Sequence, residues 1–363
     1  MHKIEVKLGE RRHTIHIAPG CLSQVGQLAR EAVGEKPRQA VVVSNPRVDA
    51  LYGRSTARSL AGAGFQSHRF LIGDGERFKN LRTAETLYTF MIERRIERSD
   101  VVVALGGGVV GDLAGFVAAT YLRGIRLIHA PTTLLAQIDS SVGGKTGVNH
   151  PLGKNLIGIF HQPSLVVIDP EALTTLPQRE MLAGLHEAIK YGVIKDRRLF
   201  HRIERDVDRL MQFDLERLVP LIARSCEIKA GVVRQDERET GVRRILNFGH
   251  TVGHALEAVT HYRRFLHGEA VAHGMRAASR IAELMGLLRL EERQAIDSAI
   301  SRVGELPGTK SLALGDIIAA MQHDKKAEGG FLAFVLPLEI GRVVVRADVP
   351  PRLIRSALKD TLS

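Results

Sequence analysis

Two histidines spaced one helical turn apart are the first sign of metal chemistry in this 363-residue chain. His250 and His254 lie in the run HTVGH, and their i, i+4 spacing puts both imidazoles on one face of a helix. The run has no glutamate beside its first histidine, which separates it from the HExxH motif of metalloproteases. His267 opens a further helical segment and could supply a third ligand. Spacing alone therefore favours His250 and His254 as metal ligands, with purely structural histidines as the alternative.

A glycine-rich turn indicates a second kind of site, one for phosphate groups. The run from Gly106 to Gly111 reads GGGVVG, fits the pattern GxGxxG, follows an apolar strand and opens a helix. Such a turn lets the backbone approach a pyrophosphate at the positive end of the helix. The turn follows earlier strand–helix units, and no acidic residue ends the next strand, so it departs from a simple Rossmann fingerprint. It predicts dinucleotide binding, with a tight structural turn as the alternative.

Two further stretches carry polar groups suited to phosphate or ribose. Asp74, Glu76 and Lys79 form a polar loop after a short strand. The stretch from Pro131 to Gln162 is rich in glycine and contains Lys145 among its charged side chains. It shows neither a helical nor a strand period over most of its length, which predicts an irregular and functional segment. A flexible surface loop is the alternative, although the apolar residues of this stretch argue against it.

Other charged residues are informative only in combination. Glu187 and Lys190 stand three positions apart on a predicted helix and therefore share a face. Lys229 and Arg243 could equally be solvated surface charges. The run from Asp324 through Lys326 is, by itself, a charged turn.

The elements that must position these residues fall into two parts. Up to about residue 170, β-branched runs alternate with helical segments; the runs are 40–43, 101–105, 126–129 and 165–168. Strands without polar alternation are buried on both faces, which predicts a parallel sheet covered by helices. An opening hairpin, about 2–8 and 12–17, should form an edge of this sheet.

Helical patterns dominate after residue 170. They cover about 177–195, 197–211, 214–236, 247–260, 268–287 and 290–304. A strand pair at 331–336 and 342–345 and a last helix from Pro351 follow. The predicted class is α/β plus all-α, with a Rossmann-like domain over 1–170 and a mostly helical domain over 171–363.

Composition and charge narrow the class of protein. The formal net charge is +11, but the basic residues are scattered and only 5% of residues are aromatic, so nucleic-acid binding is disfavoured. The two cysteines, Cys21 and Cys226, form no CxxC motif, which indicates a reducing compartment. The first residues lack a signal-peptide core, and the longest apolar stretch is interrupted by Asp112 and glycines. We expect a cytoplasmic protein that binds neither nucleic acid nor membrane.

Six segments carry a resemblance to a known family. They read GGGVVGDLAGFVAATYLRG, PTTLLAQIDSSVGGKTGVNHPLGKNLIGIFHQP, LHEAIKYGVI, CEIKAGVVRQDERETGVRRILNFGHTVGHALE, HGEAVAHGM and HDKK. In this order and spacing, over about residues 40–330, they resemble the 3-dehydroquinate synthase family of the shikimate pathway. The resemblance implies an NAD-binding N-terminal domain and a metal- and substrate-binding C-terminal domain.

The resemblance also changes the expected metal site. It implies Glu187, His250 and His267 as ligands of one divalent ion, zinc or cobalt. The family's counterpart of His254 faces the substrate phosphate instead, so the resemblance replaces the pair that spacing favoured. Three protein ligands leave a position open for substrate, as in catalytic zinc sites.

Residue roles for the substrate and for NAD follow from the same resemblance. The groups implied at the substrate phosphate are Lys145, Asn155, His254, one of Lys325 and Lys326, and Arg123 of a neighbouring subunit, which implies a homodimer. The groups implied elsewhere on the substrate are Lys229 and Arg243 at its carboxylate, Asn247 and Asp139 as hydrogen-bonding partners, and Lys190 near its hydroxyls. The groups implied for NAD are Asp74, Glu76, Lys79, Gly107, Gly108, Val109, Val110, Gly111, Asp112, Thr132, Thr133, Lys145, Lys154, Leu173, Thr174 and Thr175.

The implied reaction converts 3-deoxy-D-arabino-heptulosonate 7-phosphate into 3-dehydroquinate and phosphate. NAD would accept a hydride from C5 and return it after phosphate elimination, and ring opening with an intramolecular aldol closure would give the carbocycle. One alternative is a related sugar-phosphate cyclase, such as a 2-deoxy-scyllo-inosose or 2-epi-5-epi-valiolone synthase. Those substrates lack the carboxylate, so the presence of both Lys229 and Arg243 favours dehydroquinate. Another alternative is a metal-dependent polyol dehydrogenase, which would release NADH.

Overall fold

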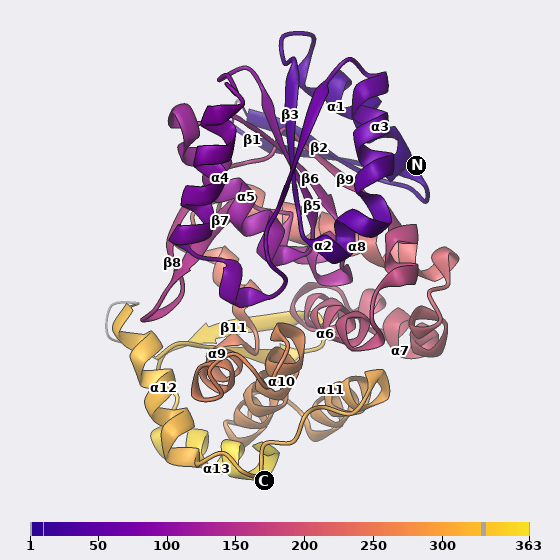
Figure 1. Cartoon of the computed structure of the whole chain (residues 1–363). Helices are drawn as coiled ribbons and strands as arrows, with labels where there is room; N and C mark the ends of the chain where they lie inside the picture. Colours follow the sequence, from indigo (N-terminus) through magenta and orange to yellow (C-terminus); the bar gives the residue numbers. More distant parts are fainter. Residues whose placement is uncertain (1, 10, 328–331, 363) are drawn as a thin grey trace. The chain divides into compact units, whose positions relative to one another are not determined.

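The computed structural model divides the chain into two compact units (Figure 1). It describes residues 2–9, 11–327 and 332–362, without the side chains of residues 323–327. One unit comprises the chain up to Leu176 together with Leu218–Arg238, and the other comprises Pro177–Arg217 together with the chain from Glu239. The sequence analysis assigned everything after residue 170 to the second domain, whereas 171–176 and 218–238 cluster with the first unit here.

A seven-stranded sheet forms the centre of the first unit. In spatial order its strands are β1 (His2–Leu8), β2 (Arg11–Ile17), β9 (Leu165–Ile168), β6 (Arg126–Pro131), β5 (Val101–Gly106), β3 (Gln39–Ser44) and β4 (Gln66–Leu71). β1 pairs antiparallel with β2, and every other pairing is parallel. The predicted parallel sheet and its opening hairpin are therefore confirmed.

Helices cover both faces of this sheet. The helices of the unit are α1 (Val25–Val33), α2 (Pro46–Val48), α3 (Arg54–Gly62), α4 (Leu81–Glu93), α5 (Gly108–Thr120) and α8 (Leu215–Gln235), of which α8 begins just before the unit boundary. Val102 of β5 faces a core formed with α4 and α5, whereas Val101 and Val103 face a core formed with α1 and α3. Successive side chains of a strand point to opposite faces, so burial on both faces explains the unbroken valine run. The Rossmann-like fold class is confirmed.

The stretch from Pro131 to Gln162 is more regular than predicted. It contains an antiparallel pair, β7 (Lys145–His150) and β8 (Gly153–Phe160), which forms a separate two-stranded sheet. The prediction of an irregular segment was wrong because most side chains of β8 are exposed, including Leu156 at 62%. A strand without one buried face leaves no alternation of polar and apolar residues to detect.

The second unit is mostly helical, as predicted. Its elements are α6 (Gln178–Lys195), α7 (Arg197–Met211), α9 (His250–Val259), α10 (His267–Leu284), α11 (Leu290–Val303), α12 (Leu314–Ala327), β10 (Phe334–Glu339), β11 (Arg342–Arg346) and α13 (Pro351–Leu362). α10 lies in the core and packs against α6, α9, α11, α13 and β10. The run from Asp324 to Lys326 belongs to α12 and is not a turn, because helix-forming residues continue the pattern through it. Among the described residues, no helix is long and apolar enough to cross a membrane.

Two buried histidines of the first unit predict acid sensitivity. His13 on β2 and His129 on β6 are each only 5% exposed, and burial lowers the pKa of each to about 4. An unfolded histidine binds its proton near pH 6.5, so between pH 6.5 and 4 protons favour the unfolded state. The stability present above pH 6.5 should fall as the pH drops through this window, by up to about 3 kcal/mol per histidine. Urea unfolding across the window measures this slope, and the variant His129→Leu should flatten it. An unchanged slope in that variant would contradict the assignment.

Candidate functional site

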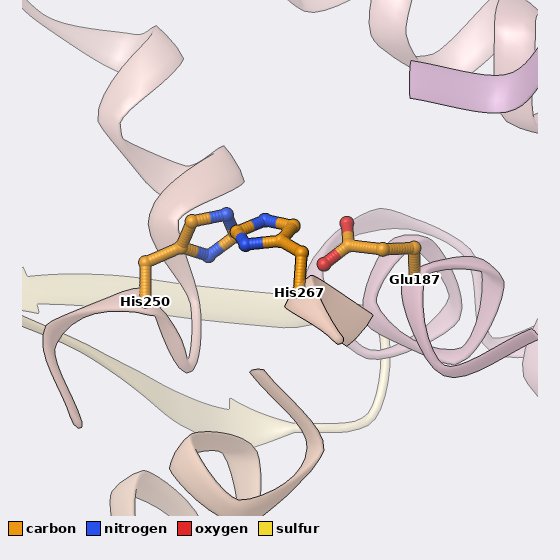
Figure 2. Close-up of side chains that lie close together, drawn as sticks. All are labelled: Glu187, His250 and His267. Atoms are coloured by element: carbon orange, nitrogen blue, oxygen red, sulfur yellow. The ribbon is translucent and has the colours of Figure 1, made fainter. Parts of the chain in front are cut away.

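A carboxylate and two imidazoles converge in the second unit. Glu187 comes from α6, while His250 and His267 are the first residues of α9 and α10, and the side chains point toward one another (Figure 2). One ligand atom from each residue lies within 4.8 Å of the others. Two nitrogens and one carboxylate oxygen are a donor set typical of catalytic zinc.

The carboxylate of Glu187 is the least satisfied group in this cluster. It is 0% exposed, and neither of its oxygens accepts a hydrogen bond from a described residue, although it forms an ion pair with Lys190 one turn later. A buried carboxylate without hydrogen bonds is strongly unfavourable unless a cation compensates it. Burial and the nearby charge of Lys190 lower the pKa of His250 well below its ordinary value, which keeps this imidazole neutral and able to bind a metal. These residues fit a divalent cation.

Two glycines allow the three helices to approach closely enough to form this cluster. A Cβ added at Gly268, next to His267, would lie against the carbonyl oxygen of Ala183 on α6. A Cβ added at Gly274 on α10 would lie against the carbonyl oxygen of Gly249, which precedes His250. Any larger residue at these positions would separate α10 from the helices that carry the other two ligands.

His254 lies beside the cluster in a second arrangement. Its ring centroid is 5.3 Å from that of His250 and 6.0 Å from that of His267. A ligand atom of His254 lies within 4.8 Å of atoms from Glu257 and His267, but His254 does not join the group of Glu187 and His250. The three residues that the family resemblance implied as ligands thus form one group in the structure, and His254 belongs to a second group with Glu257 and His267.

The glycine-rich turn of the first unit has the predicted context. β5 ends at Gly106, Gly107 is extended, and α5 begins at Gly108. The next strand, β6, is followed by Thr132, whose backbone N–H donates to the carbonyl oxygen of Gly106 at 3.0 Å. Thr133 lies against Gly107, where an added Cβ would come within 3.1 Å of its Cγ2. The N-terminus of α5 and the carboxyl ends of β5 and β6 thus meet where parallel sheets commonly bind nucleotides.

Lys79 organises a polar cluster near this turn. Its Nζ donates to Asp112 Oδ2 at 3.0 Å and to Asn155 Oδ1 at 2.6 Å, and it lies 3.2 Å from Glu76. Burial alone would lower the pKa of Lys79, but Asp112 and Glu76 raise it above its ordinary value. For Asp112, burial raises the pKa, and this effect outweighs the lowering caused by the charge of Lys79. The cluster joins four residues predicted to bind NAD or substrate, and Lys154 lies 4.0 Å from Glu76 at its edge.

Lys229 on α8 contacts another predicted site residue. Its Nζ donates to Asp139 Oδ1 at 2.7 Å and to the Asp139 carbonyl oxygen at 2.8 Å. Lys229 is a buried cation with a carboxylate partner, so the alternative that it is a solvated surface charge was wrong. Arg243 is buried as well, in a turn of the second unit that ends at Asn247. The surface alternative therefore fails for both basic residues.

Several predicted site residues lie outside these clusters. Lys145 begins β7 and is exposed, and Arg123 is exposed after α5 with a left-handed φ of 67°. Asp74 accepts a hydrogen bond from Asn45 Nδ2 at 3.1 Å. The run from Leu173 through Thr174 to Thr175 ends a short 3₁₀ helix (Pro170–Thr175). The side chains of Lys325 and Lys326 lie outside the described part of the structure.

Sequence reasoning missed residues that the structure places beside the predicted ones. Glu257 contacts His267, Glu239 accepts a hydrogen bond from Asn247 Nδ2 at 2.7 Å, and Asn149 Nδ2 donates to Glu76 at 2.8 Å. For Glu257 a signal was available, because it follows His250 and His254 at helical spacing on one face. The other two contacts join residues of different short elements, with Asn247 and Glu76 in short 3₁₀ helices, and have no periodic signal.

A solved structure defines the class of protein to which this fold belongs. The 2-epi-5-epi-valiolone synthase of Streptomyces hygroscopicus subsp. jinggangensis, determined with NAD⁺ and Zn²⁺ bound, matches with a TM-score of 0.89 and 30% identity. The match covers 98% of this chain and 98% of that one. The chain therefore has the fold of an NAD- and zinc-binding synthase.

The particular family follows from the sequence comparisons. The model for the 3-dehydroquinate synthase N-terminal region matches residues 69–183, and the C-terminal model matches residues 184–327. The 3-dehydroquinate synthase of Gloeobacter violaceus is 51% identical over 363 residues, 100% of this chain and 99% of that protein. That of Nostoc punctiforme is 49% identical over 362 residues, 98% of each. The chain belongs to the 3-dehydroquinate synthase family.

The close approach of α9 and α10 predicts the effect of one methyl group. Gly274→Ala should lower the free energy of unfolding by about 1–3 kcal/mol, because the added Cβ meets backbone and not a flexible side chain. It should also weaken zinc binding, since the helices carrying His250 and His267 must move apart. Urea unfolding and zinc titration measure both effects. The matched control is Gly315→Ala on α12, where an added Cβ meets nothing within 4 Å. Equal behaviour of the two variants would show that the glycine contact does not position the ligands.

Proposed function

We propose that this chain catalyses the 3-dehydroquinate synthase reaction, with 3-deoxy-D-arabino-heptulosonate 7-phosphate as substrate. The observation that carries the proposal is the buried group of Glu187, His250 and His267 in a chain of this family. The relative from Streptomyces hygroscopicus binds both NAD⁺ and Zn²⁺, which supports the same two cofactors here. We also propose a cytoplasmic enzyme, as the sequence analysis predicted.

The metal would be held by Glu187, His250 and His267. When bound there, a divalent ion would acidify a substrate hydroxyl, and NAD would accept a hydride from the carbon that bears this hydroxyl and later return it. The buried charge of Glu187 is the group that selects a cation over a neutral ligand. His250 stays neutral because its pKa is lowered, so it binds metal without first losing a proton.

The carboxylate end of the substrate would be recognised by Lys229 and Arg243. Lys229 is held in place by Asp139, so its ammonium is oriented before the substrate binds. A guanidinium such as that of Arg243 can bind a carboxylate through two parallel hydrogen bonds. Asn247 would hydrogen-bond the substrate and Lys190 would lie near its hydroxyls, as in the family.

The phosphate end would be recognised by His254, Lys145 and Asn155, with one of Lys325 and Lys326. We propose that Arg123 completes this set from a second copy of the chain, in a homodimer. The exposed position of Arg123 supports a role toward a partner rather than toward its own unit. The departing phosphate would itself accept the C6 proton, so the role of these cations would be positioning and charge stabilisation.

NAD would bind at the glycine-rich turn of the first unit. The backbone N–H groups at the start of α5 suit its pyrophosphate, because Gly107 and Gly108 carry no side chains of their own that would block the approach of a ligand. Lys79 orders Asp112 and Glu76 beside this turn. Because the hydride returns to the substrate, the bound NAD would not be consumed.

Phosphate release from the proposed substrate tests the function directly. Purified protein with catalytic amounts of NAD should release phosphate from 3-deoxy-D-arabino-heptulosonate 7-phosphate, and a chelator should stop the release. No NADH absorbance should accumulate. The matched control is a sugar phosphate of similar size without the carboxylate, which should react poorly. Faster release from that control would favour a related cyclase, and NADH accumulating with simple polyols would favour a dehydrogenase.

The ligand assignment predicts different effects for neighbouring histidines. Glu187→Ala and His267→Ala should abolish both zinc binding and turnover, because each removes a ligand. His254→Ala should keep zinc but lose activity, because it removes a contact to the phosphate. Zinc content after dialysis, measured beside phosphate release, checks each variant. Loss of zinc in His254→Ala with retention in His267→Ala would restore the pair suggested by helical spacing.

A further inference from the structure

Glu257 is a buried carboxylate that has no role in the proposed reaction. It lies on α9 seven residues after His250 and three after His254, so all three side chains share one face of the helix. Its side chain is 3% exposed, and burying a carboxylate is unfavourable unless hydrogen bonds or opposite charges compensate it. A glutamate on the buried face of this helix therefore needs a compensating partner.

The imidazole of His267 is one such partner, and its Nδ1 has a counterpart in the Nδ1 of His250. Glu257 Oε2 lies 3.3 Å from His267 Nδ1, and the carbonyl oxygen of Phe248 lies 3.2 Å from His250 Nδ1. Each Nδ1 thus faces a hydrogen-bond acceptor that cannot donate, because a carbonyl oxygen carries no proton and neither does an ionised carboxylate. An Nδ1–H that donates to such an acceptor leaves Nε2 as the lone-pair nitrogen.

We propose that Glu257 is a positioning residue that fixes the tautomer and orientation of His267, so that Nε2 is presented to the metal. The inference rests on the proposed metal site and deepens it. Glu257 acts through His267 and does not contact the ion. In metal sites, such outer carboxylates hold a ligating imidazole in place and raise its basicity.

The same geometry allows a second role for Glu257, which an experiment has to distinguish from the positioning role. Ligand atoms of His254, Glu257 and His267 also lie within 4.8 Å of one another, so Glu257 could bind a cation directly. The two readings use the carboxylate differently, because a positioning residue needs only a hydrogen-bond acceptor, whereas a ligand needs the carboxylate oxygen itself. Glutamine keeps an acceptor in the same place and removes the charge.

Zinc affinity of the full chain tests the positioning role without any turnover. Zn²⁺ alone is titrated in competition with a chromophoric chelator, for the unaltered protein, Glu257→Ala and Glu257→Gln. Glu257→Ala should weaken zinc binding about 10–100-fold, as expected for an outer-shell partner, and Glu257→Gln should lose less. The matched control is Glu292→Gln on α11, where another buried glutamate pairs with Arg197 and not with a histidine. This control should bind zinc as tightly as the unaltered protein.

The absorption spectrum of the Co²⁺ form decides between the two readings. Glu257→Gln should keep the spectrum of the unaltered protein, because the ligands Glu187, His250 and His267 are unchanged. A changed spectrum in that variant would make Glu257 a direct ligand and overturn the inference, even if Glu257→Ala does not fold. Zinc binding by Glu257→Ala at full affinity would also overturn it. If the unaltered protein bound no zinc, the proposed metal site itself would fail, and the two failures are thereby distinguished.

Discussion

The constraint on which the second unit depends is a negative charge placed where water cannot reach it. Glu187 is fully buried and its oxygens accept no hydrogen bond from the described residues, so its compensation must come from positive charge. Lys190 supplies part of it from the same helix. The glycine contacts at Gly268 and Gly274 allow two imidazoles to face the same point. The close packing of the helices is therefore what brings these polar side chains together, and the core of this unit surrounds a polar centre.

The first unit combines a glycine turn at a helix start with buried lysines that pair with carboxylates of the same unit. The glycine turn after β5 exposes N–H groups at a helix start, and Lys79 ties Asp112 and Asn155 together beside it. Lys229 is likewise fixed by Asp139 before any ligand is present. Both lysines are satisfied by carboxylates in the protein alone. A ligand bound beside these lysines would therefore replace or extend existing ion pairs.

The sequence predicted most of the fold because its patterns arise from burial. The valine runs of β3 and β5 are buried on both faces, and the strand–glycine–helix order at Gly106–Gly108 has a local cause in turn geometry. β8 was missed because its side chains are largely exposed and carry no pattern. In the site, helical spacing could relate His250 to His254, but it could not bring in Glu187, which is close only through the packing of α6 against α10. Glu187 was predicted from the family resemblance alone, and the packing of α6 against α10 explains why it lies near the two histidines.

The shared placement of Glu187, His250 and His267 has a consequence for the integrity of the second unit. The residues come from three helices, of which α6 is distant in sequence from α9 and α10, and two of them are the first residues of their helices. A cation held by all three would act as a cross-link, restricting the unfolded chain as a covalent bridge between distant segments does. The bound ion would then stabilise the fold of the second unit as well as act as a Lewis acid, and its loss would weaken the packing of the two helix starts as well as stop the reaction.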